Sequence, residues 1–394
     1  MGQEVSINSD RLVDACGDGS FEAGISITTR LEPLAGDGAP VKPAIYEGGT
    51  YQHDVRWHGV GTERHRVNVV VIDNVPSQAN RIEAALRQVR SLLGLPELVL
   101  DLQGLPNLPV HLAQAISSFS FPHRNADAYL RDSALDGVEF TKTELGRAIF
   151  RATADDPAPL LSWLPQALLF GFWQSHLGKK GPQSKLARSW VSEIVGYDPA
   201  TTETKIAGVK GDPLNLSIDD ALEYDEQNLL SWSAGDGKKT GKSKSKDSLA
   251  EIGHGQVLMS GATPAGVSFR EIEQQSSLSF AGLRRINLPA EGRALLAAVG
   301  LAGHVFAFGR SMSLRSGCEL RPVQPRWQWR GDGSDSDMVA LTGESAAELV
   351  ARCAERARSV GLDLDGWGRE PLVLVPGKQL DTVIRKSYPD FEGL

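Results

Sequence analysis

The segment 66–96 constrains the fold of this chain more than any other, because it joins a strand to a helix through a short turn. Its sequence, RVNVVVIDNVPSQANRIEAALRQVRSLLGLP, opens with β-branched residues that predict a strand at about 66–72. Apolar residues then recur at helical spacing, and they predict a helix that begins near Pro76 and ends near Gly94. A sheet and helices that share one core are therefore expected.

The other patterned segments mix strands and helices without a regular alternation. Strands are predicted at 24–34, 186–198, 266–280, 325–330 and 371–376. Helices are predicted at about 276–286, 291–308 and 344–360, and in the nearly all-apolar run 157–173, with a kink at Pro165. This mixture predicts an α+β fold with large loops rather than a doubly wound sheet.

One polar stretch interrupts the apolar pattern. Residues 199–251 are rich in glycine and lysine and weakly periodic, which is typical of a long, partly flexible insertion. The chain contains no internal repeat. We therefore expect a single domain over 1–394 with this insertion within it.

The charge is unevenly distributed. A net charge of −8 excludes a uniformly basic surface for nucleic acid, but residues 179–188 hold four cations and no acid, and residues 237–246 hold five cations. Because salt screens charges beyond roughly 10 Å, each segment is able to hold a polyanion locally. The array Lys179, Lys180, Lys185 and Arg188 is the more constrained of the two, since it leads directly into a predicted strand.

Compartment and cofactors are indicated mainly by missing motifs. The three cysteines form no C-x-x-C pair, and the start of the chain lacks an export signal, so a cytoplasmic protein is expected. The apolar run 294–308 is shorter than the ~20 residues of a membrane span and indicates a buried helix, hence no membrane. No spacing suits a metal site, and no cofactor is expected.

The stretch AGDGKKTGKS at 234–243 resembles a phosphate-binding loop but misses the pattern G-x-x-x-x-G-K-[ST] by one residue. A nucleotide-hydrolysing switch would depend on this stretch alone, and we expect no ATP binding there.

Three further features have a structural and a functional interpretation. Trp327 and Trp329 share one face of a predicted strand, and core packing is favoured over a stacking platform for bases. Asp73 follows the strand VVVID, where a turn or helix-cap role is favoured over catalysis. His254 lies between two glycines and suits either a turn or a phosphate contact.

Four segments together resemble a known family. They are IDNVPSQANRIEAAL (72–86), YLRDSALDG (129–137), FGFWQSHLGKKGPQSKLARSWVSEIVGYDP (170–199) and EIGHGQVLMSGATPAGVSFREIEQQSSLSFAGLRRI (251–286). In order and spacing they are similar to the backbone subunit of the type I-G (formerly I-U) CRISPR interference complex (Cascade), a protein of the RAMP superfamily.

The resemblance implies a palm built on a modified RNA-recognition (ferredoxin-like) sheet, with insertions that form a thumb and fingers. Copies would form a helical filament along the CRISPR RNA, which pairs with target DNA through its exposed bases. It also implies contacts with a large subunit, with a subunit that processes and caps the guide end, and with a recruited helicase-nuclease. The chain itself would be non-catalytic and serve antiviral defence.

The same resemblance implies which residues contact the RNA backbone without reading the bases. They are Gln78, Asn80, Arg81, Lys179, Lys180, Lys185 and Arg188, with Arg131 and His254 as weaker candidates. The alternative is a RAMP-type endoribonuclease that acts on precursor or target RNA. In that case Asp73, Asp132 and His254 would be the candidate catalytic residues.

Overall fold

The computed structural model divides the chain into two compact units. The larger consists of Met1–Ala44, Gln52–Ala200 and Val267–Leu394, and the smaller of Ile45–Tyr51 and Thr201–Gly266. The residues that the structure describes are 5–59, 61–105, 108, 112–174, 184–200, 204–205, 214, 222–225, 228–234, 263–264 and 266–387. Most of the insertion predicted at 199–251 lies outside these described residues.

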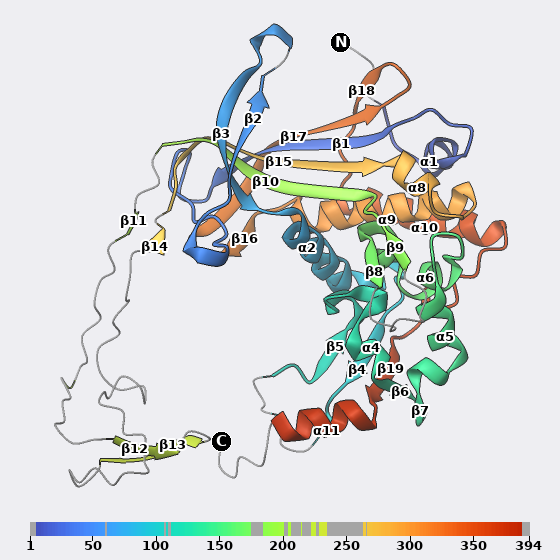
Figure 1. Ribbon diagram of the computed structural model, residues 1–394. Helices are drawn as coiled ribbons and strands as arrows, with labels where there is room; N and C mark the ends of the chain where they lie inside the picture. Colours follow the sequence, from blue (N-terminus) through green and yellow to red (C-terminus); the bar gives the residue numbers. More distant parts are fainter. Residues whose placement is uncertain are drawn as a thin grey trace. The chain divides into compact units, whose positions relative to one another are not determined.

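An eight-stranded antiparallel sheet organises the larger unit (Figure 1). Its order is β16-β17-β1-β15-β10-β3-β2, and β18 also pairs with β17. The strands are β1 (Gly24–Pro33), β2 (His53–His58), β3 (His65–Asp73), β10 (Trp190–Pro199), β15 (Phe269–Ser279), β16 (Met312–Arg315), β17 (Cys318–Arg330) and β18 (Asp335–Met338).

The centre of this sheet has ferredoxin-like topology. Helix α2 (Val75–Gln88) lies in sequence between β1 and β10, and α9 (Ala290–Phe308) lies between β15 and β17. The spatial order β17-β1-β15-β10, with every neighbour antiparallel, is that of a β-α-β-β-α-β unit. This confirms the predicted α+β fold and is compatible with an RNA-recognition-type palm.

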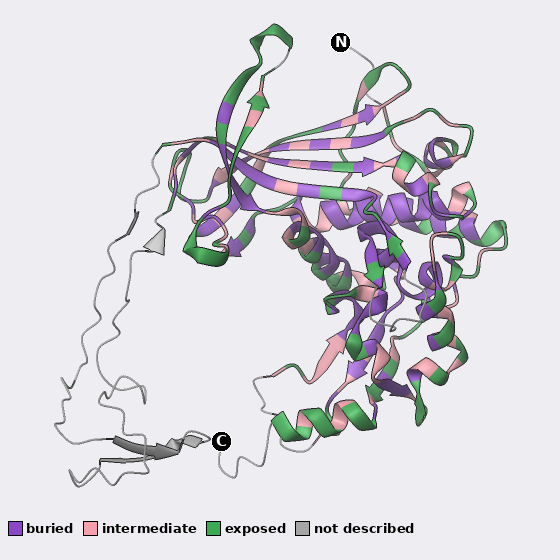
Figure 2. Cartoon of the chain, viewed as in Figure 1, coloured by how far each residue is buried: buried purple, intermediate pink, exposed green. Residues whose placement is uncertain are grey.

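The two faces of the sheet differ in character, as the alternating colours of its strands in Figure 2 show. Ile25 and Ile27 of β1 are 1% exposed and lie on the buried face. On β17 Trp327 and Trp329 are 5% and 2% exposed, and Trp329 packs against Phe280 with ring centroids 5.1 Å apart. The prediction that both tryptophans belong to the core is confirmed.

Helix α9 is the central helix of the core. It is long and apolar enough to cross a membrane, but most of it is buried inside this unit against α2 and α10 (Gly343–Ser359). A Cβ atom added at Gly303 would lie 2.5 Å from Cγ2 of Ile82, so glycine there permits the close approach of α9 to α2. The predicted buried helix at 291–308 is confirmed.

A second, smaller sheet joins segments that are distant in sequence. Its order is β5-β4-β19-β6-β7, so a strand near the C-terminus lies between strands of the first half of the chain. These strands are β4 (Leu98–Asp101), β5 (Ala115–Ser117), β6 (Ser133–Leu135), β7 (Val138–Glu139) and β19 (Leu372–Pro376). Other helices of the unit include α1 (Ser9–Cys16), α3 (Arg90–Leu93), α4 (Ala128–Arg131), α5 (Glu144–Arg151), α8 (Phe280–Arg284) and α11 (Lys378–Ser387).

A chain of buried hydrogen bonds crosses the sheet under α2 and α9. Gln78 donates from Nε2 to Asp73 at 2.5 Å, and its Oε1 accepts from Gln274 at 2.7 Å and from the hydroxyl of Ser192 at 3.0 Å. The chain continues through Ser276 to Nδ1 of His304. Because buried polar groups are costly without partners, this chain fixes α2 and α9 relative to the sheet.

The smaller unit contains short antiparallel pairs among its described residues. They are β12 (Leu222–Asp225) with β13 (Asn228–Ala234) and β11 (Thr204–Lys205) with β14 (Thr263–Pro264).

Candidate nucleic-acid interface

A two-stranded hairpin carries part of the predicted cationic array. Helices α6 (Ala158–Trp163) and α7 (Pro165–Phe170) are separated at Pro165, as predicted, and strand β8 (Phe172–Gln174) follows and pairs with β9 (Ser184–Leu186). The prediction that the helix extends to residue 173 is wrong. Gly171 ends it with φ 76°, and a Cβ atom there would lie 2.5 Å from the carbonyl oxygen of Leu186.

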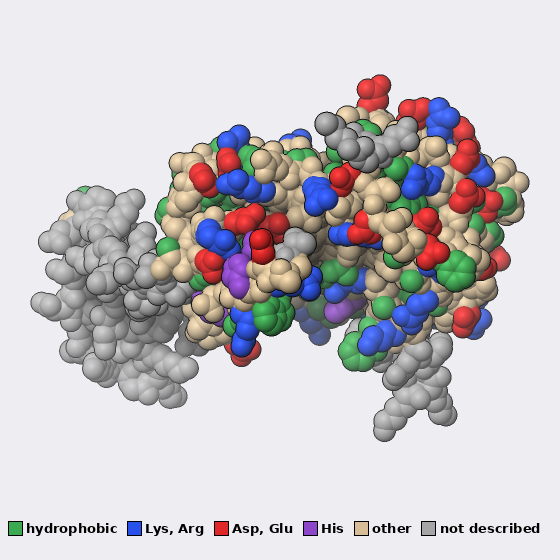
Figure 3. Space-filling view, turned by 90° about the horizontal axis from the view of Figure 1, so that it is seen from above, with side chains coloured by type: hydrophobic (Ala, Val, Ile, Leu, Met, Phe, Trp, Pro, Cys, Tyr) green, Lys and Arg blue, Asp and Glu red, His purple; other side chains and the backbone are tan. Residues whose placement is uncertain are grey.

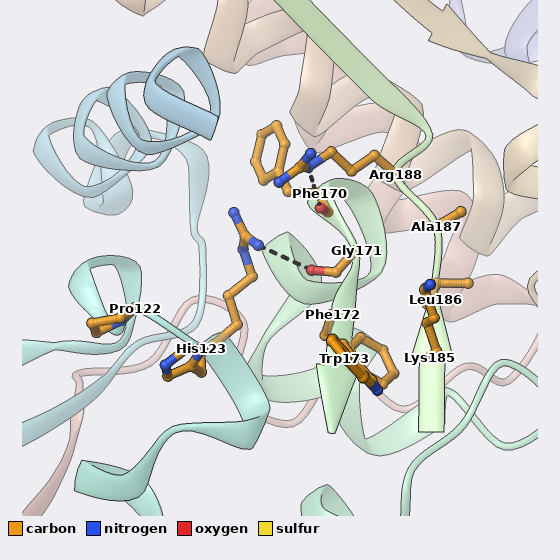
Figure 4. Close-up of a pocket in the computed structure, with 11 residues that line it drawn as sticks. Pro122, His123, Phe170, Gly171, Phe172, Trp173, Lys185, Leu186, Ala187 and Arg188 are labelled. Atoms are coloured by element: carbon orange, nitrogen blue, oxygen red, sulfur yellow. Dashed lines mark hydrogen bonds between the residues drawn. The ribbon is translucent and has the colours of Figure 1, made fainter. Parts of the chain in front are cut away.

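An open pocket of about 480 Å³ lies beside this hairpin (Figure 4). Three segments form it: the turn at 122–124, the end of α7 with β8, and β9 with the residues that follow it. Its lining therefore combines aromatic rings with cationic side chains.

An exposed tryptophan forms one wall of the pocket. Trp173 is 63% exposed, although it follows directly on the buried residues Phe170 and Phe172. Lys185 lies opposite Trp173 in the strand register, and its Nζ is 5.7 Å from the centroid of the Trp173 ring (Figure 4). An exposed ring beside a lysine provides a stacking surface for a base and a contact for its phosphate.

Two arginines make the interior of the pocket electropositive. Arg124 donates from Nε and Nη2 to the buried carboxylate of Glu83 at 2.7 and 2.9 Å, and from Nη1 to the carbonyl oxygen of Gly171 at 3.0 Å. Arg188 donates from Nε to the carbonyl oxygen of Phe170 at 3.2 Å, and no described residue forms an ion pair with it. Desolvation and the nearby charge of Arg124 lower the pKa of Arg188.

Burial also acts on the carboxylate of Glu83. Desolvation raises the pKa of Glu83, while the charges of Arg124 and Arg188 act in the opposite direction. Glu83 is already paired with Arg124 and so does not neutralise Arg188 as well. An anion bound from solution would therefore relieve the repulsion between the guanidinium groups of Arg124 and Arg188. The pocket is therefore chemically suited to a phosphate and a stacked base.

The structure brings together Lys185 and Arg188 from the predicted set, since both line this pocket. Lys179 and Lys180 lie in sequence between β8 and β9, but outside the described residues, as does His254. Their predicted contacts with RNA stay predictions.

The residues predicted on α2 separate into different environments. Gln78 is 0% exposed, and both ends of its amide are bonded inside the protein, so its predicted contact with RNA is corrected to a structural role. Arg81 donates to both carboxylate oxygens of Asp73 and to the carbonyl oxygen of Leu314, which leaves its guanidinium committed to the fold. Asn80 is exposed and stays a candidate.

Asp73 is fully buried and has a different role from the cap that the sequence suggested. Asn74 caps α2 by accepting from the backbone of Ser77, whereas Asp73 pairs with both Arg81 and Arg315. With 0% exposure and all its partners inside the protein, Asp73 has no access to a substrate. This geometry disfavours Asp73 as the catalytic carboxylate of a ribonuclease.

Arg131 lies at a separate pocket of about 430 Å³, which Lys378 and Glu139 also line. Its guanidinium donates to Asp132 at 2.8 and 2.6 Å, and this pairing raises the pKa of Arg131. Arg131 therefore does not join the cluster of Lys185 and Arg188.

Trp173 and Arg124 are functional candidates that the sequence did not indicate. The sequence did contain a signal for Trp173. Gly171 interrupts the apolar run and permits a turn there, so the helical pattern does not predict burial of the residues after it. No local signal existed for Arg124, whose partner Glu83 is distant in sequence.

The open face of the main sheet is a poor base-stacking surface. Strands β1 and β15, which are described in full, expose no aromatic side chain there, and their outward residues include Thr28, Arg30, Glu273 and Gln275. Cations and acids are intermixed when the molecule is viewed from this side (Figure 3). An exposed aromatic ring and cations instead lie together at the pocket beside β8 and β9.

Part of the chain matches a known protein family. Residues 25–201 match a family model described as "CRISPR-associated protein GSU0053", and this range contains β1 except its first residue, α2, β10 and every residue that lines the pocket. No curated protein matches the chain. Part of this chain, residues 25–201, is therefore similar to a CRISPR-associated protein family.

Proposed function

We propose that this chain is a non-catalytic backbone subunit of a type I-G CRISPR interference complex, and that it binds the guide RNA. The observation that carries this proposal is the pocket in which exposed Trp173 lies beside Lys185 and near Arg188. The family match and the ferredoxin-like core support the same assignment.

The chemistry of the pocket explains how it would hold a guide. Stacking on an indole ring accepts any base, and cations contact phosphate without reading base edges. A guide held in this way keeps the hydrogen-bonding edges of its bases free to pair with target DNA. Several copies would bind along one cytoplasmic guide, together with the large subunit and the subunit that processes the guide end, and a helicase-nuclease would cut the DNA.

Removal of the stacking ring is expected to weaken RNA binding. Because a stacked base contributes roughly 1 to 3 kcal/mol, Trp173→Ala should reduce the affinity for a 30-nucleotide oligouridine about tenfold. Fluorescence anisotropy with labelled RNA measures this change, and Trp173→Phe should retain most of the affinity. An unchanged affinity of Trp173→Ala would contradict the assignment of this pocket.

The same titrations test the cations through their salt dependence. Lys185→Gln combined with Arg188→Gln should lower the slope of log affinity against log salt by about 1.4, because each phosphate contact on a single strand contributes about 0.7. A control with the same loss of charge is Lys142→Gln with Arg352→Gln, since both cations are exposed and paired with Glu139 and Glu348. The control should keep the original slope.

A further inference from the structure

The hairpin formed by β2 and β3 carries the other exposed tryptophan among the residues whose burial is described. Trp57 is 67% exposed and Val55, on the same face of β2, is 48% exposed. In Figure 2 the outer end of this hairpin is exposed, in contrast to the strands of the sheet below it. An indole ring at such a position adds little to the core and is free to contact a ligand.

Cations share this face with Trp57. Arg66 is the direct partner of Trp57 in the strand register, and register partners place their side chains on the same face of a hairpin. Arg64 is exposed nearby, and no described residue forms an ion pair with Arg64 or Arg66. The face is therefore cationic as well as aromatic, and is complementary in charge to a polyanion.

The other face of the hairpin is occupied by contacts with the sheet. Arg56 forms a bidentate ion pair with Glu193 of β10 and also pairs with Asp54. Because Asp54 is neutralised by Arg56, it does not offset the positive charge of the outer face. The ring of His58 lies 4.5 Å from that of Tyr197. Because these contacts anchor the hairpin, Trp57 and Arg66 are held in position before a ligand arrives.

The arrangement repeats that of the pocket on a different element. In both hairpins an exposed tryptophan lies directly opposite a cation across two antiparallel strands: Trp173 opposite Lys185, and Trp57 opposite Arg66. We propose that the outer face of the β2–β3 hairpin is a second site for single-stranded nucleic acid. A base stacks on Trp57, and Arg66 and Arg64 contact its phosphates.

Cross-linking locates this site independently of the pocket. This inference rests on the proposed function only in the class of ligand that it assumes. The probe is a 30-nucleotide oligomer of 4-thiouridine. It is irradiated in complex with the full chain, and the cross-linked residues are mapped by mass spectrometry. Adducts in 53–66 as well as in 172–186 are expected. Adducts in 172–186 alone would overturn the second site and leave the proposed function standing, whereas adducts in 53–66 alone would support the second site and remove the pocket. Adducts in neither segment would overturn both.

Binding measurements provide a second test. Trp57→Ala combined with Arg66→Gln should weaken binding of a 30-nucleotide oligouridine about five- to tenfold, and Trp57→Phe with Arg66→Lys should restore most of it. Leu92→Ala is the matched control, because Leu92 is 63% exposed on α3, away from both hairpins in sequence. If Trp57→Ala instead reduces the mass measured by sedimentation without nucleic acid and leaves binding unchanged, the face is an interface between copies and the inference is wrong.

Discussion

Replacement of Asp73 by asparagine is expected to lower the free energy of unfolding by about 3 kcal/mol. The carboxylate is 0% exposed and accepts from Arg81, Arg315, Ser77 and Gln78. Loss of its charge leaves two guanidinium groups without their counterion, and removal of one partner from a buried pair costs about 3–5 kcal/mol. We expect the lower end, because the side chains of Arg81 and Arg315 are 27% and 25% exposed and keep some water.

Urea unfolding followed by circular dichroism measures this effect. The matched control is Asp337→Asn, since Asp337 is 56% exposed and pairs with Arg326 on the surface. Exposed pairs contribute at most about 1 kcal/mol, so the control should change little. If Asp73→Asn lowers the free energy of unfolding no more than the control does, the buried ion pairs of Asp73 do not stabilise the packing of α2 and β16.

Stability is expected to fall below neutral pH because of His304. Burial lowers the pKa of His304 to about 3, and its surroundings are Trp190, Trp327, Phe308 and the hydroxyl of Ser276. The unfolded chain binds the proton with a pKa of about 6.5, so the stabilisation is complete above that pH and is lost as the pH falls toward 3. Between pH 7 and pH 5 the loss should be about 2 kcal/mol.

The variant His304→Gln isolates this contribution, because it removes the titrating group and leaves every other group in place. Between pH 7 and pH 5 the wild type should lose about 2 kcal/mol more than the variant in urea unfolding. Its absolute stability does not matter for this comparison, since only the change with pH is used. Equal losses in both proteins would show that His304 takes up a proton in the folded state.

Local patterns predicted the core of the fold well. Strands β1, β10, β15 and β19 and the helices α9 and α10 form where alternation or helical spacing indicated them. The β2–β3 hairpin was missed in part, because residues 53–66 are largely exposed and carry no apolar alternation. The four strands that pair around β19 in the small sheet were missed, because they are short and their pairing with β19 spans most of the chain length, which no local pattern encodes.

The candidate site was predicted less completely than the fold. The cationic array pointed to Lys185 and Arg188, since charge density is visible in a sequence. The roles of Gln78 and Arg81 were not visible, because polar residues near a helix start suit a ligand and an internal carboxylate equally well. In the folded protein the buried carboxylate of Asp73 is that internal partner, and Arg315 of β16 pairs with it as well. Tertiary pairing, which the sequence does not show, therefore determined which cations remain free for a ligand.

Co-expression of the chain with a CRISPR array tests the central claim most directly. The purified protein should carry RNA of guide length, and electron microscopy of that material should show several copies along each RNA. The combined variant Trp173→Ala, Lys185→Gln and Arg188→Gln should remain folded and recover much less RNA. Recovery of the unaltered chain as an RNA-free monomer would contradict the claim that it binds a guide RNA as one of many identical subunits.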